Sequence, residues 1–313
     1  MTEIEVVRER LEPKLLEFEG IVGISHKNPK KFVIYVEDEK TAKRVPSYLA
    51  GYPVETVVAG RVRALPLVQA KTIQRVRPLV GGLSIGPPAE VAGTLGIIIN
   101  GRILTNAHVI GIDWVNVDWY PTGTPIYQPS LIDGGKEEDV VGYLSMCEKI
   151  HFNAKHKNVV DVALADCTAD FREMEVIQIG KISGIRSATE GEKVRKVGRT
   201  TGLTESEVFD TKATIKVDYG PFGYAWFTDC IVVKPAFAQG GDSGSAIISE
   251  DNSLIGLLFA GSEYITIANR IENVLTAMGK IGVEFEMGTT LLGVLAVGAI
   301  LGYFTSEATG MIL

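Results

Sequence analysis

The chain has 313 residues, 46% of them hydrophobic, which is long enough for two or three units with cores of their own. The net charge of −7 and the lack of a basic stripe argue against nucleic acid as a partner. The odd set Cys147, Cys167 and Cys230 is scattered, which indicates free thiols in a reducing compartment rather than disulfides. They form no CxxC motif or Cys/His cluster, so we expect no metal and no cofactor.

Residues 1–65 predict a small α/β domain. Residues 3–18 are charged and amphipathic, as in a surface helix, although Pro13 can break or kink it. A second helix is expected over 38–50, and strands over 20–24, 32–36 and 54–58. The role of this domain is open between substrate presentation, oligomer contact, cleft regulation and a structural cap.

Residues 66–80 have the character of a connector. We find no signal-peptide pattern at the N-terminus and therefore expect a cytoplasmic protein. The chain holds 34 glycines, and its short apolar runs are broken by turn residues. This pattern favours an all-β body, which we place at residues 81–280.

His108 is the first candidate for chemistry. It follows the apolar run 95–99, an Asn100-Gly101 pair typical of a hairpin turn, and the short run Ile103-Leu104. A histidine at the end of such a strand can stand in a cleft, as a general base must. A satisfied structural histidine is the alternative.

Asp161 is the second candidate. It opens the alternating segment 161–165, which predicts a strand, and an aspartate there can also be a plain cap or a solvated end. His151 and His156 lie near it in sequence and are rivals to His108, but they sit in a charged polar stretch.

Ser243 is the third, in the small-residue loop 240–245. A serine hydroxyl needs a base to take its proton, and a tetrahedral intermediate needs N–H groups aimed at its oxyanion. The N–H groups of Gly241 and Ser243 are our candidate oxyanion hole. A turn without catalytic function is the alternative. The order His, Asp, Ser is that of one convergent solution to acyl transfer.

The C-terminal segment 287–306 carries no charged side chain and approaches the length of a membrane-spanning helix. A hydrophobic segment buried in a homo-oligomer or against the rest of the chain is the alternative. If it is a membrane anchor, the body stays on the cytoplasmic side.

The triad segments resemble those of the chymotrypsin-like, or trypsin-fold, serine proteases. Flanking stretches 80–86, 196–203 and 256–262 are similar to a prokaryotic and plant branch that includes the narrow-leaf type of plant protease. The resemblance covers about residues 78–278, and more loosely the first 65. It implies two perpendicular antiparallel β-barrels with a cleft between them, in which His108 is the general base, Asp161 orients it and Ser243 is the nucleophile.

The resemblance also implies a substrate pocket. It would be shaped by residues before and after the serine, namely Phe237, Ala238, Phe259, Ala260 and Gly261. Position 237 would favour basic side chains if it held an acid, and it holds Phe, so we expect an apolar or small residue before the scissile bond.

Asp242 departs from the secreted members of the family. Many of these pair this acid with an N-terminal amine freed by cleavage, which is not evident in this chain. Arg195, Lys196 and Arg199 are candidate partners instead.

These observations predict a serine endopeptidase that acts on protein or peptide substrates through an acyl-enzyme. The alternatives are a trypsin-fold binding or assembly scaffold with little turnover, and a protease whose main substrate is its own chain.

Overall fold

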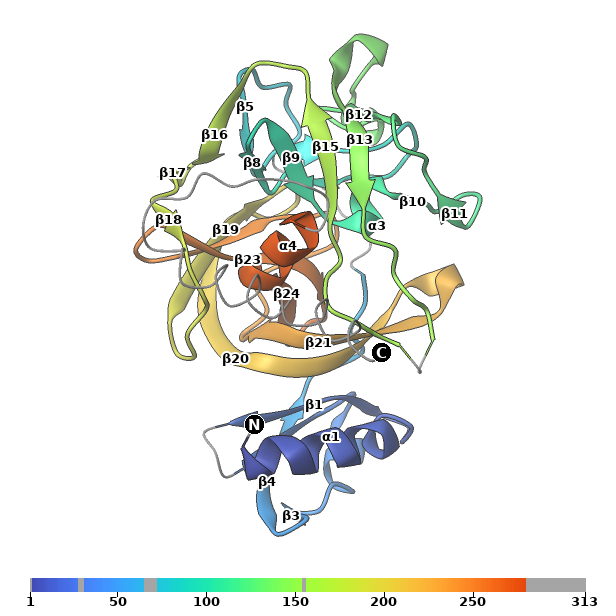
Figure 1. Ribbon diagram of the computed structural model, residues 1–313, viewed down its shortest axis with the longest axis vertical. Coiled ribbons are helices and arrows are strands. Elements are labelled where there is room, and N and C mark those ends of the chain that lie inside the picture. Colours follow the sequence, from blue (N-terminus) through green and yellow to red (C-terminus); the bar gives the residue numbers. More distant parts are fainter. Residues whose placement is uncertain (1, 28–30, 65–71, 154–155, 280–313) are drawn as a thin grey trace, which may run out of the picture. The chain divides into compact units, whose positions relative to one another are not determined.

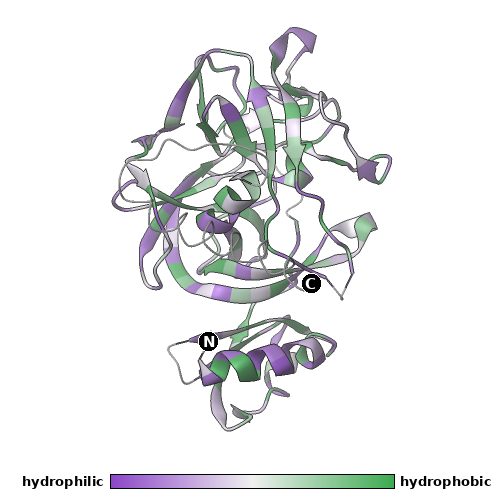
Figure 2. Cartoon of the chain, in the orientation of Figure 1, coloured by the Kyte–Doolittle hydropathy of each residue, from purple (hydrophilic) through white to green (hydrophobic). Residues whose placement is uncertain are grey.

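The N-terminal residues pack a helix on a small sheet in the computed structural model, which describes residues 2–27, 31–64, 72–153 and 156–279. Ile4 of the helix is buried with Ile24, Phe32 and Ile34 of the sheet, and Figure 2 shows the helix itself as a largely hydrophilic ribbon. The elements are α1 (Glu3–Leu15), β1 (Ile21–Lys27), β2 (Lys31–Val36), α2 (Glu39–Ala42), β3 (Tyr48–Leu49) and β4 (Tyr52–Val58).

The three predicted strands are confirmed, but the helix expected over 38–50 is wrong beyond Ala42. Asp38 starts it by accepting a hydrogen bond from the Thr41 N–H at 2.7 Å. Pro46 follows soon after, and a proline disfavours further helix because it lacks an N–H and its ring clashes with the preceding turn. In contrast, α1 includes Pro13 in its last turn.

The strand β1 joins this region to the rest of the molecule. One edge pairs with β2, and the other pairs antiparallel with β20 at Gly23–Ile215 and Ile24–Thr214. The N-terminal strands thus join a 12-stranded sheet. Eleven of its strands follow the order β14-β21-β24-β23-β22-β19-β20-β1-β2-β4-β3, and β18 pairs with β23 off this path (Figure 1). Residues 1–277 form one compact unit, and a domain boundary at residue 65 stays a prediction.

The middle of the chain forms a five-stranded sheet in the order β12-β13-β15-β9-β8. The predicted hairpin is confirmed: β8 and β9 pair antiparallel, and both turn residues have positive φ, +50° at Asn100 and +69° at Gly101. The elements are β5 (Leu79–Gly81), β6 (Ser84–Ile85), β7 (Gly93–Thr94), β8 (Ile97–Ile99), β9 (Arg102–Thr105), α3 (Ala107–Ile110), β10 (Ile112–Asp113), β11 (Asp118–Trp119), β12 (Pro125–Tyr127), η1 (Leu131–Asp133), η2 (Glu137–Asp139), β13 (Val140–Cys147), β14 (Lys157–Asn158), β15 (Ala163–Cys167), β16 (Phe171–Val176) and β17 (Gly180–Lys181).

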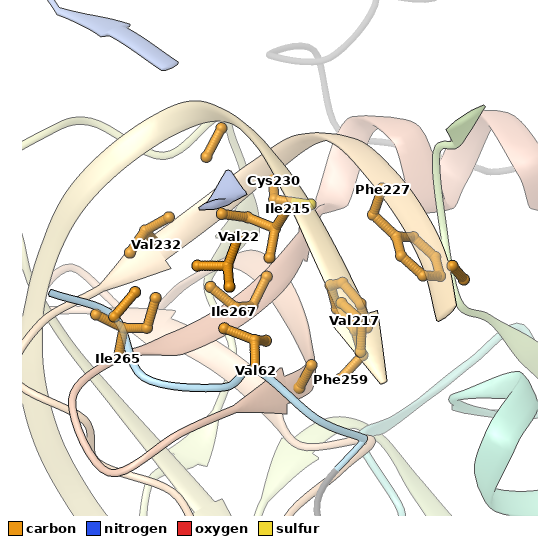
Figure 3. Packing of buried hydrophobic residues seen from close by; sticks show 14 of the residues in the cluster. Val22, Val62, Ile215, Val217, Phe227, Cys230, Val232, Phe259, Ile265 and Ile267 are labelled. Carbon is orange, nitrogen blue, oxygen red and sulfur yellow. The ribbon is translucent and has the colours of Figure 1, made fainter. Parts of the chain in front are cut away.

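The last third contributes the long strands of the large sheet. Val22 from β1 packs among Ile215, Val232 and Ile267, so strands far apart in sequence share one core (Figure 3). The elements are β18 (Gly184–Ile185), β19 (Lys193–Gly198), β20 (Gly202–Asp218), η3 (Gly220–Phe222), β21 (Tyr224–Val233), β22 (Ala246–Ser249), β23 (Ser253–Gly261), β24 (Thr266–Arg270) and α4 (Ile271–Gly279).

The predicted mainly β class is confirmed, since the described chain is mainly β with few helices, and the two barrels stay a prediction. Residues 287–306 lie outside the described residues, so their membrane and oligomer alternatives stay predictions. Within the described part, no helix is long and apolar enough to cross a membrane.

Candidate active site

His108 lies on a single helical turn directly after a sheet strand. Strand β9 ends at Thr105, and α3 begins at Ala107. The indole N–H of Trp114 donates to the His108 carbonyl at 2.9 Å, which fixes the backbone of this turn. The imidazole is only 6% exposed.

Asp161 is fully buried and holds His108 by two hydrogen bonds, one to the imidazole and one to the backbone. Its Oδ2 accepts from His108 Nδ1 at 2.5 Å, and its Oδ1 accepts from the His108 backbone N–H at 3.1 Å. Strand β15 pairs with β9, which brings Asp161, two residues before β15, to the end of β9. Because Nδ1 carries the proton toward the carboxylate, Nε2 is the basic nitrogen on the other side of the ring.

The backbone of Asp161 is fixed as tightly as its side chain. The side chain of Asn269 on β24 accepts from the Asp161 N–H at 3.2 Å and donates to its carbonyl at 3.1 Å. Asn106 donates to the same carbonyl at 2.7 Å. The rivals His151 and His156 are exposed and stack on each other with ring centroids 4.8 Å apart. Of the predicted bases, His108 is therefore the one bonded to Asp161.

Ser243 lies on a glycine loop that packs against β7 and the end of β9. Gly244 has φ +94°, and a Cβ there would overlap the Thr105 hydroxyl and the Thr94 carbonyl, so the loop fits only with glycine. The Thr94 N–H donates to the Ser243 carbonyl, and the Thr94 hydroxyl donates to the Gly241 carbonyl, both at 2.8 Å. The serine loop is thus bonded to the strand that precedes the His108 hairpin.

The serine loop and the histidine turn meet across Gly93. A Cβ on Gly93 would lie 2.6 Å from Val109, the neighbour of His108, and 3.0 Å from the Ser243 carbonyl oxygen. Ser243 Oγ and His108 Nε2 are both buried, and neither has a hydrogen-bond partner among the described residues. These two atoms are therefore not bonded to each other in this structure, and no other described group holds them. Within the same residues, the N–H groups of Gly241 and Ser243 donate to no acceptor.

Asp242 pairs with Lys196. Both side chains are fully buried, and Lys196 Nζ lies 3.2 Å from Asp242 Oδ2. The other two candidates face elsewhere: Arg195 bonds Asn252, and Arg199 bonds Asp133. The remaining donors to the Asp242 carboxylate are the N–H groups of Thr200 (2.9 Å), Thr201 (3.1 Å) and Gln239 (2.9 Å) and the hydroxyl of Thr201 (2.7 Å). The acid of the serine loop is thus satisfied without a free N-terminal amine.

Arg199 and Asp133 form a second buried ion pair beside the loop. The guanidinium donates twice, from Nε at 2.7 Å and from Nη2 at 2.6 Å. Burial by itself raises the pKa of Asp133, but hydrogen bonds from Arg199 and Ser84 outweigh it, so the pKa is lowered. The Arg199 N–H also donates to the Thr94 hydroxyl, so this pair supports the strand that holds the serine loop. Asp133 is not among the residues predicted from the sequence, because no motif marks it.

The predicted pocket residues divide between two cores. Phe237 and Ala238 pack in one apolar cluster, and Phe259 and Ala260 pack in another. Thr266 connects them, because its hydroxyl accepts from the Phe237 N–H at 3.2 Å and its backbone pairs with Gly261. The Phe259 ring contacts Phe227 at 4.7 Å between centroids, within the core.

Gly261 is also paired with the segment that follows the N-terminal region. Its N–H donates to the Arg63 carbonyl, and the Arg63 N–H donates to the Gly261 carbonyl, both at 3.0 Å. Among the described residues, no group of three His, Cys, Asp or Glu side chains could hold a metal ion.

No family model and no curated protein matches this chain. Solved structures do resemble it. Chymotrypsin from Cellulomonas bogoriensis is 19% identical, with a TM-score of 0.46 over 64% of this chain and 95% of that one. Thermobifida fusca protease A is 18% identical, with a TM-score of 0.47 over 64% and 95%. Nocardiopsis protease is 18% identical, with a TM-score of 0.46 over 64% and 96%. The structures that this chain resembles are serine proteases of the trypsin fold, the family predicted from the motifs.

Proposed function

We propose that this protein is a serine endopeptidase in which Ser243, His108 and Asp161 hydrolyse peptide bonds through an acyl-enzyme. The observation that carries the proposal is the buried His108–Asp161 hydrogen bond of 2.5 Å, next to a glycine loop that holds Ser243. In this proposal the five-stranded sheet and the 12-stranded sheet form the two antiparallel barrels of such an enzyme, and the triad lies where the barrels meet.

The chemistry follows from the atoms in place. Ser243 Oγ attacks the carbonyl carbon of the substrate, and its proton passes to His108 Nε2. Asp161 accepts from Nδ1 throughout and stabilises the imidazolium that forms. The N–H groups of Gly241 and Ser243, which have no acceptor in the described part of the chain, donate to the oxyanion. His108 then gives its proton to the leaving amine, and water repeats the cycle on the acyl ester.

The absent Ser243–His108 hydrogen bond fits this mechanism. Catalytic hydrogen bonds in free enzymes are often long and tighten when substrate binds. Both atoms already lie in a buried site without competing partners among the described residues.

The substrate proposed is a protein or peptide with an apolar or small residue before the scissile bond. No acid stands at Phe237, and the buried Lys196 near its ring, at 5.8 Å, is committed to Asp242. A basic side chain would find no counter-charge at this position.

A fluorophosphonate probe tests the proposal on the full-length chain. We expect covalent labelling of the wild type, none of Ser243→Ala, and at least a hundredfold slower labelling of His108→Ala, because the base is lost. Ser47→Ala, on an exposed serine far from the loop, is the control for the substitution. Labelling that persists in Ser243→Ala would disprove the nucleophile assignment. Folded wild type that takes up no label would favour the scaffold alternative, and intact mass would detect self-cleavage.

A further inference from the structure

Tyr219 places a hydroxyl on the carboxylate that orients the histidine. It follows β20 directly, and its phenol donates to Asp161 Oδ2 at 2.8 Å. The same oxygen accepts from His108 Nδ1 at 2.5 Å. Tyr219 is 1% exposed, and its ring meets the His108 ring edge to face at 6.0 Å. The phenol and the imidazole therefore share one oxygen of Asp161.

The phenol ring is fixed on several sides. It stacks on Phe227 at 6.0 Å and meets the edge of Phe152 at 5.5 Å. The Tyr219 N–H donates to the Gly223 carbonyl at 2.8 Å, which closes the turn between β20 and β21. Because the ring cannot turn away without breaking this packing, the hydroxyl is held ready on Asp161 in the absence of substrate.

The phenol stays a donor at neutral pH. Burial raises the pKa of Tyr219, and the charge of Asp161 raises it further. Two thiols interact electrostatically with these residues: Cys147 of β13 with Asp161, and Cys230 of β21 with Tyr219. Burial raises the pKa of both thiols, so they remain neutral as well. The charge on Asp161 is thus balanced by fixed dipoles and by His108 when it is protonated.

We propose that Tyr219 is a positioning residue for the triad: its hydroxyl fixes the Asp161 carboxylate toward His108 and moderates the negative potential at the imidazole. This inference rests on the proposed function. It extends the triad to a residue on the β20–β21 turn, 58 positions from Asp161 in the chain. A hydrogen bond to a charged group is strong enough to affect turnover.

Tyr219→Phe removes the hydroxyl and keeps the ring. We expect kcat to fall about tenfold with KM nearly unchanged, because a charge-assisted hydrogen bond is lost from the catalytic machinery alone. We also expect the acid limb of the pH profile of kcat/KM to move to higher pH, since the imidazole then faces a less neutralised carboxylate. Tyr143→Phe, an exposed phenol on β13, is the matched control and leaves both unchanged.

A readout that does not need turnover keeps this test independent of the proposed function. In the Ser243→Ala background at low pH, the proton of His108 Nδ1 gives a far-downfield NMR signal, which we expect Tyr219→Phe to shift. An unshifted signal, or an unchanged kcat and pH profile in an active and folded variant, overturns the inference. If wild type takes up no fluorophosphonate, the proposed function fails, and the NMR signal still tests the contact.

A second, independent observation concerns the edge of β23. Residues 61–64 pair with its last residue and with the end of β20: Arg63 exchanges two backbone hydrogen bonds with Gly261, and the Ala64 N–H donates to the Asp218 carbonyl at 3.1 Å. Val62 is buried in the core beside Ile267 (Figure 3). Arg61 adds an ion pair to Asp218 at 2.8 Å. The segment is thus held by backbone, apolar and charged contacts together.

We infer that residues 61–64 are an internal competitor for extended substrates. Peptides that add a strand to a sheet edge bind through backbone N–H and C=O groups. Both groups of Gly261, a residue of the predicted substrate pocket, are taken by Arg63. An extended peptide must displace this segment before it can pair there, whereas a fluorophosphonate has no peptide backbone and does not need that edge.

Arg63→Pro and Arg63→Ala form a matched pair for this test. Proline removes the N–H that donates to Gly261, while alanine removes the side chain and keeps the backbone pair. We expect KM for an extended peptide to fall about tenfold in Arg63→Pro, as one backbone bond is lost, and to change less than twofold in Arg63→Ala. Fluorophosphonate labelling stays at the wild-type rate in both.

Arg61→Ala is a second variant that loosens the segment without a proline, in case Arg63→Pro does not fold. It loosens the ion pair to Asp218 and leaves every backbone bond, so we expect KM to shift about twofold in the same direction. Equal KM values across wild type, Arg63→Pro and Arg61→Ala would overturn the inference. Absence of labelling in all of them would instead reject the proposed function.

Discussion

Two buried aspartates of the candidate site, Asp161 and Asp242, have opposite kinds of hydrogen-bond partners. Asp161 faces a histidine that can gain and lose a proton, together with a neutral phenol. Asp242 faces a lysine and four further donors, and its surroundings hold a fixed positive charge. Both carboxylates are fully buried, so burial alone does not distinguish them.

The partners explain the difference. A buried charge is tolerated only when it is paired and hydrogen-bonded. Around Asp242 this pairing is complete, which suits a structural role in holding the serine loop. Around Asp161 one partner is itself the proposed base, so the compensation changes during each turnover. Mutations on the two sides should therefore separate activity from stability.

Asp161→Asn should have the largest effect on activity. The amide cannot accept the Nδ1 proton as the carboxylate does, so the imidazole favours the tautomer with the proton on Nε2 and cannot take one from Ser243. We expect kcat/KM to fall about 10⁴-fold, as measured with a peptide substrate. Asp166→Asn, on an exposed aspartate of β15 paired with Arg102, should change it less than about twofold. A loss below tenfold in Asp161→Asn would contradict the assigned role.

Lys196→Met should have the largest effect on stability. It leaves the buried Asp242 charge without its cation, and we expect the free energy of unfolding in urea to fall by about 3–5 kcal/mol. Lys193→Met, on an exposed lysine of the same strand, should stay within about 0.5 kcal/mol. Combining Lys196→Met with Asp242→Asn should cost less than the sum of the two single changes, because the unpaired charge is removed. Strict additivity would show that the pair does not couple.

Asp133 gives a smaller effect that depends on pH. Its pKa is lowered in the folded protein by Arg199 and Ser84 against the effect of burial. The folded state then binds protons less readily than the unfolded state, whose Asp has a pKa of about 3.9, so stability is lost as pH falls below that value. Urea unfolding at pH 5 and pH 3 should show a larger loss for wild type than for Asp133→Asn. Equal losses would mean that the Arg199 pair does not stabilise the fold.

Local features were predictable to different degrees. The Asn100-Gly101 turn and its strands follow from turn chemistry and apolar runs, and they are confirmed. The helix over 38–50 was overestimated because the pattern was followed past Pro46, where the chain instead forms β3. The three candidate active-site residues were chosen by motif, and the structure places His108 and Asp161 in contact and the Ser243 loop against the same strands.

Turns, strand patterns and small-residue loops are set by neighbours along the chain, so the short elements and the residue types of the proposed chemistry could be predicted from the sequence. Three long-range contacts became visible only in the folded chain: the pairing of Asp242 with one of three candidate cations, the contact of Tyr219 with Asp161, and the pairing of Arg63 with Gly261. The first two contacts join residues 46 and 58 positions apart. Such partners depend on strand register and packing, which no local pattern encodes.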